Sequence, residues 1–204
     1  MDQYTPFHPD NIVEGVTLGN AATYYPRIVA LFEALERAYQ CRVVVAAHPR
    51  SDYDRHPDYF GGRTVLRGET AKLISRARLV ITQHSLANSF CVMFRKPMLV
   101  VCTDDMLRHD IVARDLRLFS ELAGSPALNI DHPWQLPDPA SLRVNEERYA
   151  RYERLVLKRK DTPEMNTWEI VGRFFHARGL GHDQESSTVG ARMEPTSNTQ
   201  LSRE

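Results

Sequence analysis

The chain has 204 residues, 42% hydrophobic and 25% charged, which is enough for one ordinary domain with a core of its own. Its 26 basic and 26 acidic side chains cancel, whereas a nucleic-acid-binding domain normally carries a basic excess. No stretch approaches the roughly 18 apolar residues of a membrane span, and the first residues lack a signal-peptide pattern. Three cysteines without C-x-x-C spacing lie in or beside apolar segments: Cys41, Cys91 and Cys102. We therefore expect a cytoplasmic protein with reduced, buried thiols and no nucleic-acid partner.

The first third of the chain predicts a helix followed by a buried strand. Residues 1–20 contain several proline and glycine breakers and are expected to be irregular. Apolar side chains recur at helical spacing over residues 21–39. Residues 42–47 are rich in valine and almost continuously apolar, which is typical of a parallel strand covered on both faces. The segment 48–62 then predicts a long loop, before a short strand over 63–67.

The alternation of helix and strand continues to about residue 130. The expected elements are a helix over 70–77, a strand over 79–82, a helix over 86–94, a strand over 98–102, a helix over 104–122 and a strand over 127–130. This order predicts an α/β fold: a Rossmann-like open parallel sheet with helices on both faces and right-handed crossovers. Two C-terminal helices follow, over 145–160 and from Pro163 through Phe174. We take residues 1–179 as one domain and 180–204, which have almost no apolar content, as a disordered tail.

The first candidate site element is His48-Pro49-Arg50, directly after the buried strand over 42–47. Proline disfavours helix at the residue before it, so His48 is expected to be extended at the end of the strand. An imidazole can donate to a phosphate, and Arg50 can add a bidentate contact. The alternative is an ordinary loop start, because three other His-Pro pairs occur in the chain, at His8, His56 and His132.

The second element is Thr82-Gln83-His84-Ser85, with Asn88 and Ser89 one turn later. If a helix begins near Leu86, Ser85 is its N-cap, and the amides of its first turn suit an anionic phosphate. The alternative is a serine cap with no ligand. Adjacent parallel strands would bring this element and the His-Pro element to one cleft at the carboxyl edge of the sheet.

Three further features have both a functional and a structural interpretation. Glu69 could accept from ribose hydroxyls, or it is solvated while Thr70 caps the next helix. Asp104-Asp105 could suggest a metal site, but a pair at a helix start is the simpler interpretation, and we expect no metal or cofactor. The basic helix over 145–160 is either solvated, packed against another domain, or in contact with a membrane surface.

Together these residues resemble the C-terminal half of bacterial surface and capsular polysaccharide glycosyltransferases with the GT-B fold, near the sialyltransferase and Kdo-transferase groups. The matching stretches, within residues 1 to about 105, are Asp2-Gln3-Tyr4, Pro6, His8-Pro9-Asp10, Tyr24-Tyr25, Ala47-His48-Pro49-Arg50 with Tyr53, Gly68, Thr70-Ala71, Leu73-Ile74, and Ser85 before Lys96-Pro97. The resemblance implies that His48 contacts the donor nucleotide and its phosphate and that Ser85 holds the phosphate from a helix start. Some family members have two adjacent hydroxyl residues, whereas Leu86 follows Ser85 here, so Thr82 or the Ser85 amide could supply the contact instead.

These observations predict a glycosyltransferase domain that binds a nucleotide-activated sugar, CMP-linked by preference, for surface polysaccharide assembly. The candidate donor-binding residues are His48, Pro49, Arg50, Glu69, Thr70, Thr82, His84, Ser85, Asn88 and Ser89, with His48 as the catalytic residue. The expected partners are the nucleotide-sugar, a glycan acceptor, and an N-terminal catalytic half or partner chain, because the family's catalytic acid or base lies in that half. Two alternatives remain open: a UDP-sugar epimerase or hydrolase, and a non-catalytic nucleotide-binding module.

Overall fold

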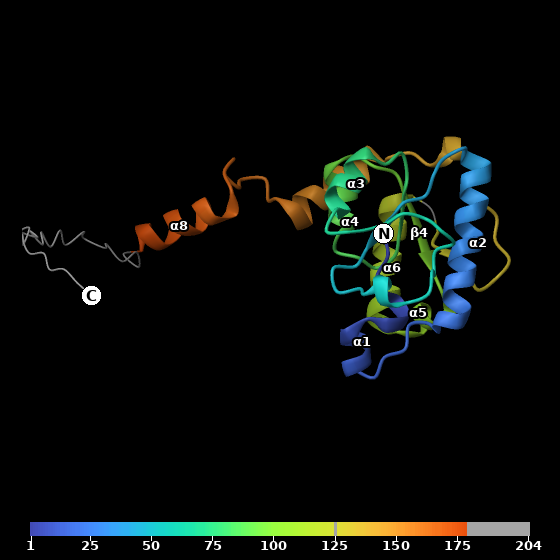
Figure 1. Cartoon of the computed structure of the whole chain (residues 1–204). Coiled ribbons are helices and arrows are strands. Elements are labelled where there is room, and N and C mark those ends of the chain that lie inside the picture. Colours follow the sequence, from blue (N-terminus) through green and yellow to red (C-terminus); the bar gives the residue numbers. More distant parts are fainter. Residues whose placement is uncertain (125, 179–204) are drawn as a thin grey trace, which may run out of the picture. The chain divides into compact units, whose positions relative to one another are not determined.

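A computed structural model describes residues 1–124 and 126–178 (Figure 1). The chain divides into two units, Met1–Lys160 and Asp161–Glu204. Helices and parallel strands alternate along the first unit, so the predicted α/β class is confirmed. The tail predicted over 180–204 lies outside the described residues. No helix in the described ranges is both long and apolar enough to cross a membrane.

The strands form two small parallel sheets in place of the single open sheet that we predicted. One sheet pairs β1 (Val45–Ala47) with β2 (Val65–Arg67), and the other has the order β3 (Val80–Thr82), β4 (Met98–Cys102), β5 (Leu128–Asn129). The N-terminal residues lie between the two sheets. The Asp2 amide donates to the Ala46 carbonyl at 3.0 Å, and the Met1 ammonium group donates to the Ile81 carbonyl. The sheets are separate because β1 and β3 each bond this segment and not each other.

Long periodic segments form helices close to the predicted bounds. α2 spans Ala21–Tyr39, as predicted, and the Asn20 side chain caps it by accepting from the Ala22 amide at 2.8 Å. α3 (Thr70–Arg76) ends one residue early, and α4 (Asn88–Met93) begins two residues later than predicted.

Other predictions need correction. The helix expected over 104–122 is two helices, α5 (Asp104–Arg108) and α6 (Asp110–Ala123), because His109 has an extended backbone between them. The helix expected over 145–160 is α7 (Glu146–Tyr152), followed by a π-helical turn over Glu153–Leu157. In the second unit, α8 (Thr167–Ala177) forms the final predicted helix.

The prediction that residues 1–20 are irregular is wrong in its first half. A 3-10 turn, η1, spans Thr5–Phe7, and a short helix, α1, spans Pro9–Val13. Proline at the first helical position does not break a helix, because the amide that it lacks has no partner there in any helix. Two further 3-10 turns complete the first unit: η2 (Tyr53–Arg55) and η3 (Pro139–Ser141).

The core of the first unit is built around β4, whose five residues are all buried. The predicted apolar stripe of α6 packs on this strand and is buried at Val112, Leu116 and Phe119. Burying one such side chain stabilises the fold by about 1.5–3 kcal/mol. None of the three cysteines forms a disulfide. Cys91 and Cys102 are buried, and burial raises the pKa of the first thiol to about 12 and of the second to about 11.

Candidate functional site

The two strand-to-loop junctions of the predicted site meet at one cavity. Its volume is about 520 Å³, and it lies at the carboxyl ends of β1 and β3. Residues 46–49, which end β1, and residues 84–87, which follow β3, both line it. The N-terminal segment between the sheets contributes the remaining wall together with Thr70 and Phe90. We call this space the histidine cavity, because His8, His48 and His84 all line it.

His8 and His48 occupy two turns of the same local geometry. The Nδ1 atom of His48 accepts from the Arg50 amide at 3.2 Å, and Nδ1 of His8 accepts from the Asp10 amide at 3.3 Å. Because Nδ1 is an acceptor in both rings, the proton of each neutral imidazole resides on Nε2. The ring centroids are 4.7 Å apart in an edge-to-face arrangement. Two adjacent imidazole N–H donors thus belong to one cavity.

An ion pair joins the two turns at their third residues. Arg50 Nη1 donates to Asp10 Oδ1 at 3.0 Å, and Arg50 Nη2 donates to Asp10 Oδ2 at 2.6 Å. Sequence reasoning assigned the bidentate geometry of Arg50 to a phosphate, whereas the structure directs it at Asp10. Arg50 does not line the histidine cavity, but Pro49 does.

Burial sets the charge state of the three histidines. Desolvation lowers the pKa of His8, His48 and His84 below the ordinary value of 6.5. The neighbouring His8 and the Arg50 guanidinium further lower the pKa of His48, so the rings are neutral at pH 7. The Nδ1 atom of His84 is buried and makes no hydrogen bond to any described residue.

Ser85 lines the histidine cavity but does not cap a helix, so that prediction is wrong. Its hydroxyl accepts from the Ala87 amide at 3.2 Å, within a turn that precedes α4. The cap residue of α4 is Ala87, and the helix has six residues. A helix this short has only a small macrodipole, so it contributes little to binding an anion.

The lining of the cavity does not include Thr82, Asn88 or Ser89. Their side chains instead make hydrogen bonds that hold α4 in place. The Thr82 hydroxyl donates to the Asn88 side chain, whose amide donates to the Gln83 carbonyl at 2.9 Å. The Ser89 hydroxyl bonds the Tyr152 hydroxyl at 3.1 Å and so links α4 to α7. These contacts give the three side chains a structural role.

Of the adjacent residues Glu69 and Thr70, both predicted to bind the donor, one contributes to the lining of the histidine cavity. Thr70 lines the cavity, whereas Glu69 does not and pairs with Lys72 at 2.8 Å. The prediction that Thr70 caps α3 is wrong, because Glu69 is the cap residue and Thr70 is already the first helical residue.

Sequence reasoning missed the N-terminal contribution to the cavity, which comprises Met1, Asp2, Gln3, Thr5, His8 and Asn11. A signal was present, because His8-Pro9-Asp10 repeats the His-Pro element with the opposite charge at its third position. Asp2 is a buried carboxyl group whose Oδ2 accepts from the Tyr53 hydroxyl at 2.7 Å and the Tyr4 amide at 3.1 Å. Desolvation raises the pKa of Asp2.

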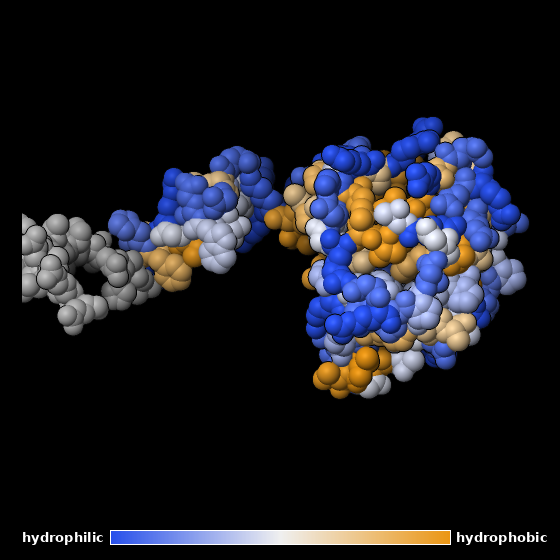
Figure 2. Space-filling model, in the orientation of Figure 1, coloured by the Kyte–Doolittle hydropathy of each residue, from blue (hydrophilic) through white to orange (hydrophobic). Residues whose placement is uncertain are grey.

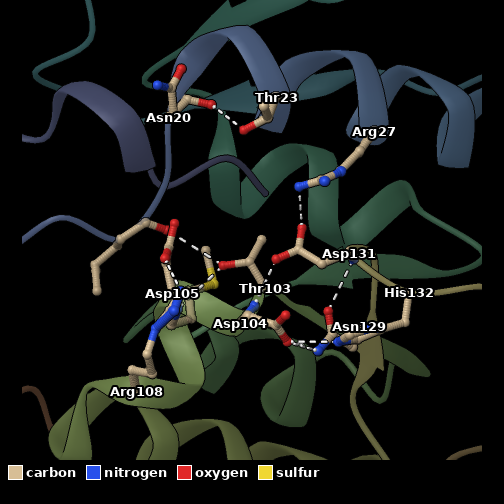
Figure 3. Close-up of polar contacts among 12 residues, drawn as sticks. Asn20, Thr23, Arg27, Thr103, Asp104, Asp105, Arg108, Asn129, Asp131 and His132 are labelled. Carbon is tan, nitrogen blue, oxygen red and sulfur yellow. Dashed lines mark hydrogen bonds and ion pairs between the residues drawn. The ribbon is translucent and has the colours of Figure 1, made fainter.

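A second polar cluster follows β4 and β5 at the same edge (Figure 3). Asp131 accepts from Arg27 of α2 at 2.6 Å and from the Asp104 amide at 2.8 Å. Asp104 in turn bonds Asn129 at 2.8 Å and His132 at 2.9 Å. The polar groups of this cluster satisfy one another, and their hydrogen bonds fix the loop after β5 against α2 and α5. Nowhere in residues 1–124 and 126–178 do three or more His, Cys, Asp or Glu side chains gather in a geometry that could hold a metal ion.

Comparison of the chain with protein-family models, curated proteins and solved structures finds no match.

Proposed function

We propose that the first unit is the donor-binding half of a GT-B-type glycosyltransferase and binds a nucleotide-activated sugar, CMP-linked by preference. The observation that carries this proposal is the pair of His-Pro turns that gives one cavity two imidazole N–H donors, from His8 and His48. Imidazole N–H groups are suitable donors to phosphate oxygens. The position of the cavity, beyond the carboxyl ends of parallel strands, is where open Rossmann-like sheets bind ligands.

In this proposal the cavity stabilises charge on the departing nucleotide. Negative charge builds up on the phosphate as its bond to the sugar breaks, and fixed N–H donors in a partly buried site stabilise that charge. His48 and His8 donate from Nε2, while Ser85 and Thr70 lie close enough to complete the polar wall. His84 contributes a third imidazole from the opposite junction.

The base that activates the glycan acceptor must come from outside the histidine cavity. Asp2 is the carboxylate among the residues that line the histidine cavity, and its Oδ2 already accepts two hydrogen bonds. We therefore assign the acid or base and the glycan-acceptor site to another half or a partner chain. An epimerase or hydrolase would require an acid–base pair within this cavity, and it would release a free or isomerised sugar.

Calorimetric titration of the chain with CMP, CDP, UDP and GDP tests the proposal. We expect selective binding of a cytidine nucleotide, and a loss of about 10-fold to 100-fold in affinity on His48→Ala, since a hydrogen bond to a charged group contributes about 1.5–3 kcal/mol. His132→Ala is the matched control, because this His-Pro residue is exposed and bonds Asp104 away from the cavity. Tight UDP binding would move the donor to a UDP-sugar, and binding that His48→Ala leaves unchanged would refute the role of the cavity.

A further inference from the structure

A second, larger cavity lies on the other side of Met1 and Asp2, toward the amino ends of β1 and β3. Its volume is about 790 Å³, and it is lined by residues 43–46 of one sheet and 79–81 of the other. Apolar side chains of α2 and α3 also line it, and further segments contribute to the wall, including three arginines: Arg42, Arg76 and Arg78. Figure 2 shows an apolar surface around the N-terminus, between α2 and α3 as labelled in Figure 1. We call this cavity the strand slot.

At its border with the strand slot, the N-terminal segment bonds both β1 and β3, as a single strand between them would. The Met1 ammonium group bonds β3 through Ile81, while the next residue, Asp2, bonds β1 through Ala46. Successive residues of a strand turn their backbone groups to opposite edges, so this alternation is that of a strand between two neighbours. The strand slot extends beyond Met1 between β1 and β3, where the preceding residues of such a strand would lie.

The N-terminal segment runs in the same direction as its neighbours. Met1 and Asp2 border the strand slot, and the chain then leads to Thr5 and His8 at the histidine cavity. β1 leads from the strand slot to His48, and β3 leads from it to His84. All three segments are therefore parallel.

One edge of β1 faces the strand slot. Val45 donates its amide to the Thr64 carbonyl on the β2 side, whereas the Ala46 carbonyl accepts from Asp2 on the other side. Backbone groups of a strand alternate between its two edges, so Val44 has its N–H and carbonyl groups on the same edge as those of Ala46. Both residues therefore face the strand slot.

One edge of β3 faces the strand slot from the other side. Val80 donates to the Pro97 carbonyl on the β4 side, and Ile81 accepts from Met1 on the opposite side. Leu79 shares the edge of Ile81 by the same alternation. Two rows of backbone groups thus face each other across a space that one strand would bridge.

The environment of Met1 favours an amide over a free amine at this position. The ammonium group is buried, and desolvation is the main cause that lowers its pKa. Burying a charge costs free energy, whereas a backbone N–H in the same place would make the bond to the Ile81 carbonyl without a charge to desolvate.

We propose that the strand slot takes one further parallel strand, an apolar segment of about four residues that is joined to Met1 by a peptide bond. The segment would unite the two sheets in the order β2, β1, new strand, β3, β4, β5. It is expected to be rich in valine, isoleucine and leucine, because a parallel strand covered by α2 and α3 is buried on both faces. This inference does not depend on nucleotide binding.

Three N-terminal extensions of the full chain test the proposal. The first adds Ile-Val-Val-Leu before Met1, the second adds Ser-Gly-Ser-Gly, and the third adds Ile-Val-Pro-Leu, whose proline lacks a backbone donor. All three keep the residues of the chain and convert the Met1 ammonium group into a peptide N–H, so they differ from one another only in the added segment. Thermal unfolding and amide hydrogen exchange at Val44 and Ile81 are the readouts.

We expect the Ile-Val-Val-Leu extension to raise Tm by at least about 5 °C over the Ser-Gly extension and to slow exchange at Val44 and Ile81 at least about 100-fold. The proline extension should lose most of this gain. Equal Tm and equal exchange in all three chains would overturn the proposal. A free Ile-Val-Val-Leu peptide that protects the same amides as well as the fused one would overturn the peptide-bond assignment and indicate a strand from a separate chain.

Discussion

Arg50 and Asp10, 40 residues apart in sequence, form a bidentate ion pair that holds two His-Pro turns side by side. The Nη1–Oδ1 and Nη2–Oδ2 distances are 3.0 and 2.6 Å. Each residue also donates its own backbone amide to the Nδ1 atom of the histidine two positions earlier. The pair therefore connects the two turns that carry the His8 and His48 rings.

This geometry separates the role of Arg50 from that of His48. We expect Arg50→Ala to change nucleotide affinity by less than about threefold, because both arms of its guanidinium group are used by Asp10 and surface ion pairs contribute little. His48→Ala should lose about 10-fold to 100-fold in the same affinity. Calorimetry with the best-bound nucleotide measures both. An Arg50→Ala loss as large as that of His48→Ala would mean that Arg50 leaves Asp10 to contact the ligand.

Nucleotide affinity should rise as the pH falls. Desolvation lowers the pKa of His8, His48 and His84 in the free protein, and a bound phosphate raises these pKa values by favouring the charged rings. Binding then takes up protons, so affinity increases by up to about tenfold per pH unit for each proton. Calorimetry at pH 7.5 and pH 5.5, in buffers of different ionisation enthalpy, measures the affinity and the proton uptake. A pH-independent affinity above the phosphate's own titration would contradict protonation of the rings on binding.

Folding stability should fall below pH 6.5 because of His84. Burial lowers its pKa in the folded state, so the unfolded chain binds the proton first and is favoured as the pH drops below 6.5. The contribution of neutral His84 to the free energy of unfolding is complete above pH 6.5, and it is lost as the pH falls through the lowered pKa of the folded state. His84→Leu removes this dependence, at most about 1.4 kcal/mol per pH unit.

Urea unfolding of the wild type and His84→Leu between pH 7.5 and 5 provides the measurement. Comparing the two chains cancels the opposite contribution of Asp2, whose pKa is raised by burial. Parallel pH profiles for the two chains would show that His84 is not the responsible group.

Asp131 should matter more for stability than its exposed neighbour Asp105. Asp131 accepts from Arg27 and from the Asp104 amide, so Asp131→Ala is expected to cost about 1–2 kcal/mol. Asp105 pairs with Arg108 on the surface of α5, so Asp105→Ala should cost less than about 0.5 kcal/mol. Denaturant unfolding measures both. Equal losses would mean that the cluster in Figure 3 does not anchor the loop after β5.

Local sequence patterns were sufficient for α2, which satisfies its own hydrogen bonds, and for β4, which is wholly buried. The helical spacing over 21–39 defined α2, and the continuous apolar run over 98–102 defined β4. β1 is shorter than its apolar run because a strand ends where its partner ends, and β2 has three residues. The single helix expected over 104–122 divides at His109, where local periodicity carried no signal for the break.

Local sequence patterns were enough to predict the α/β class and the two junctions, at His48 and at His84–Ser85, that the cavity brings together. Hydrophobic periodicity and strand ends are local properties of the chain, so they can be recognised without the fold. Three long-range contacts are visible in the folded chain alone: His8 lies beside His48, Arg50 pairs with Asp10, and the N-terminus lies between β1 and β3. Those contacts join residues that are about 40 to 80 positions apart. Which of these contacts form depends on the polar groups that remain unpaired once the core has packed. A local sequence pattern does not contain this information.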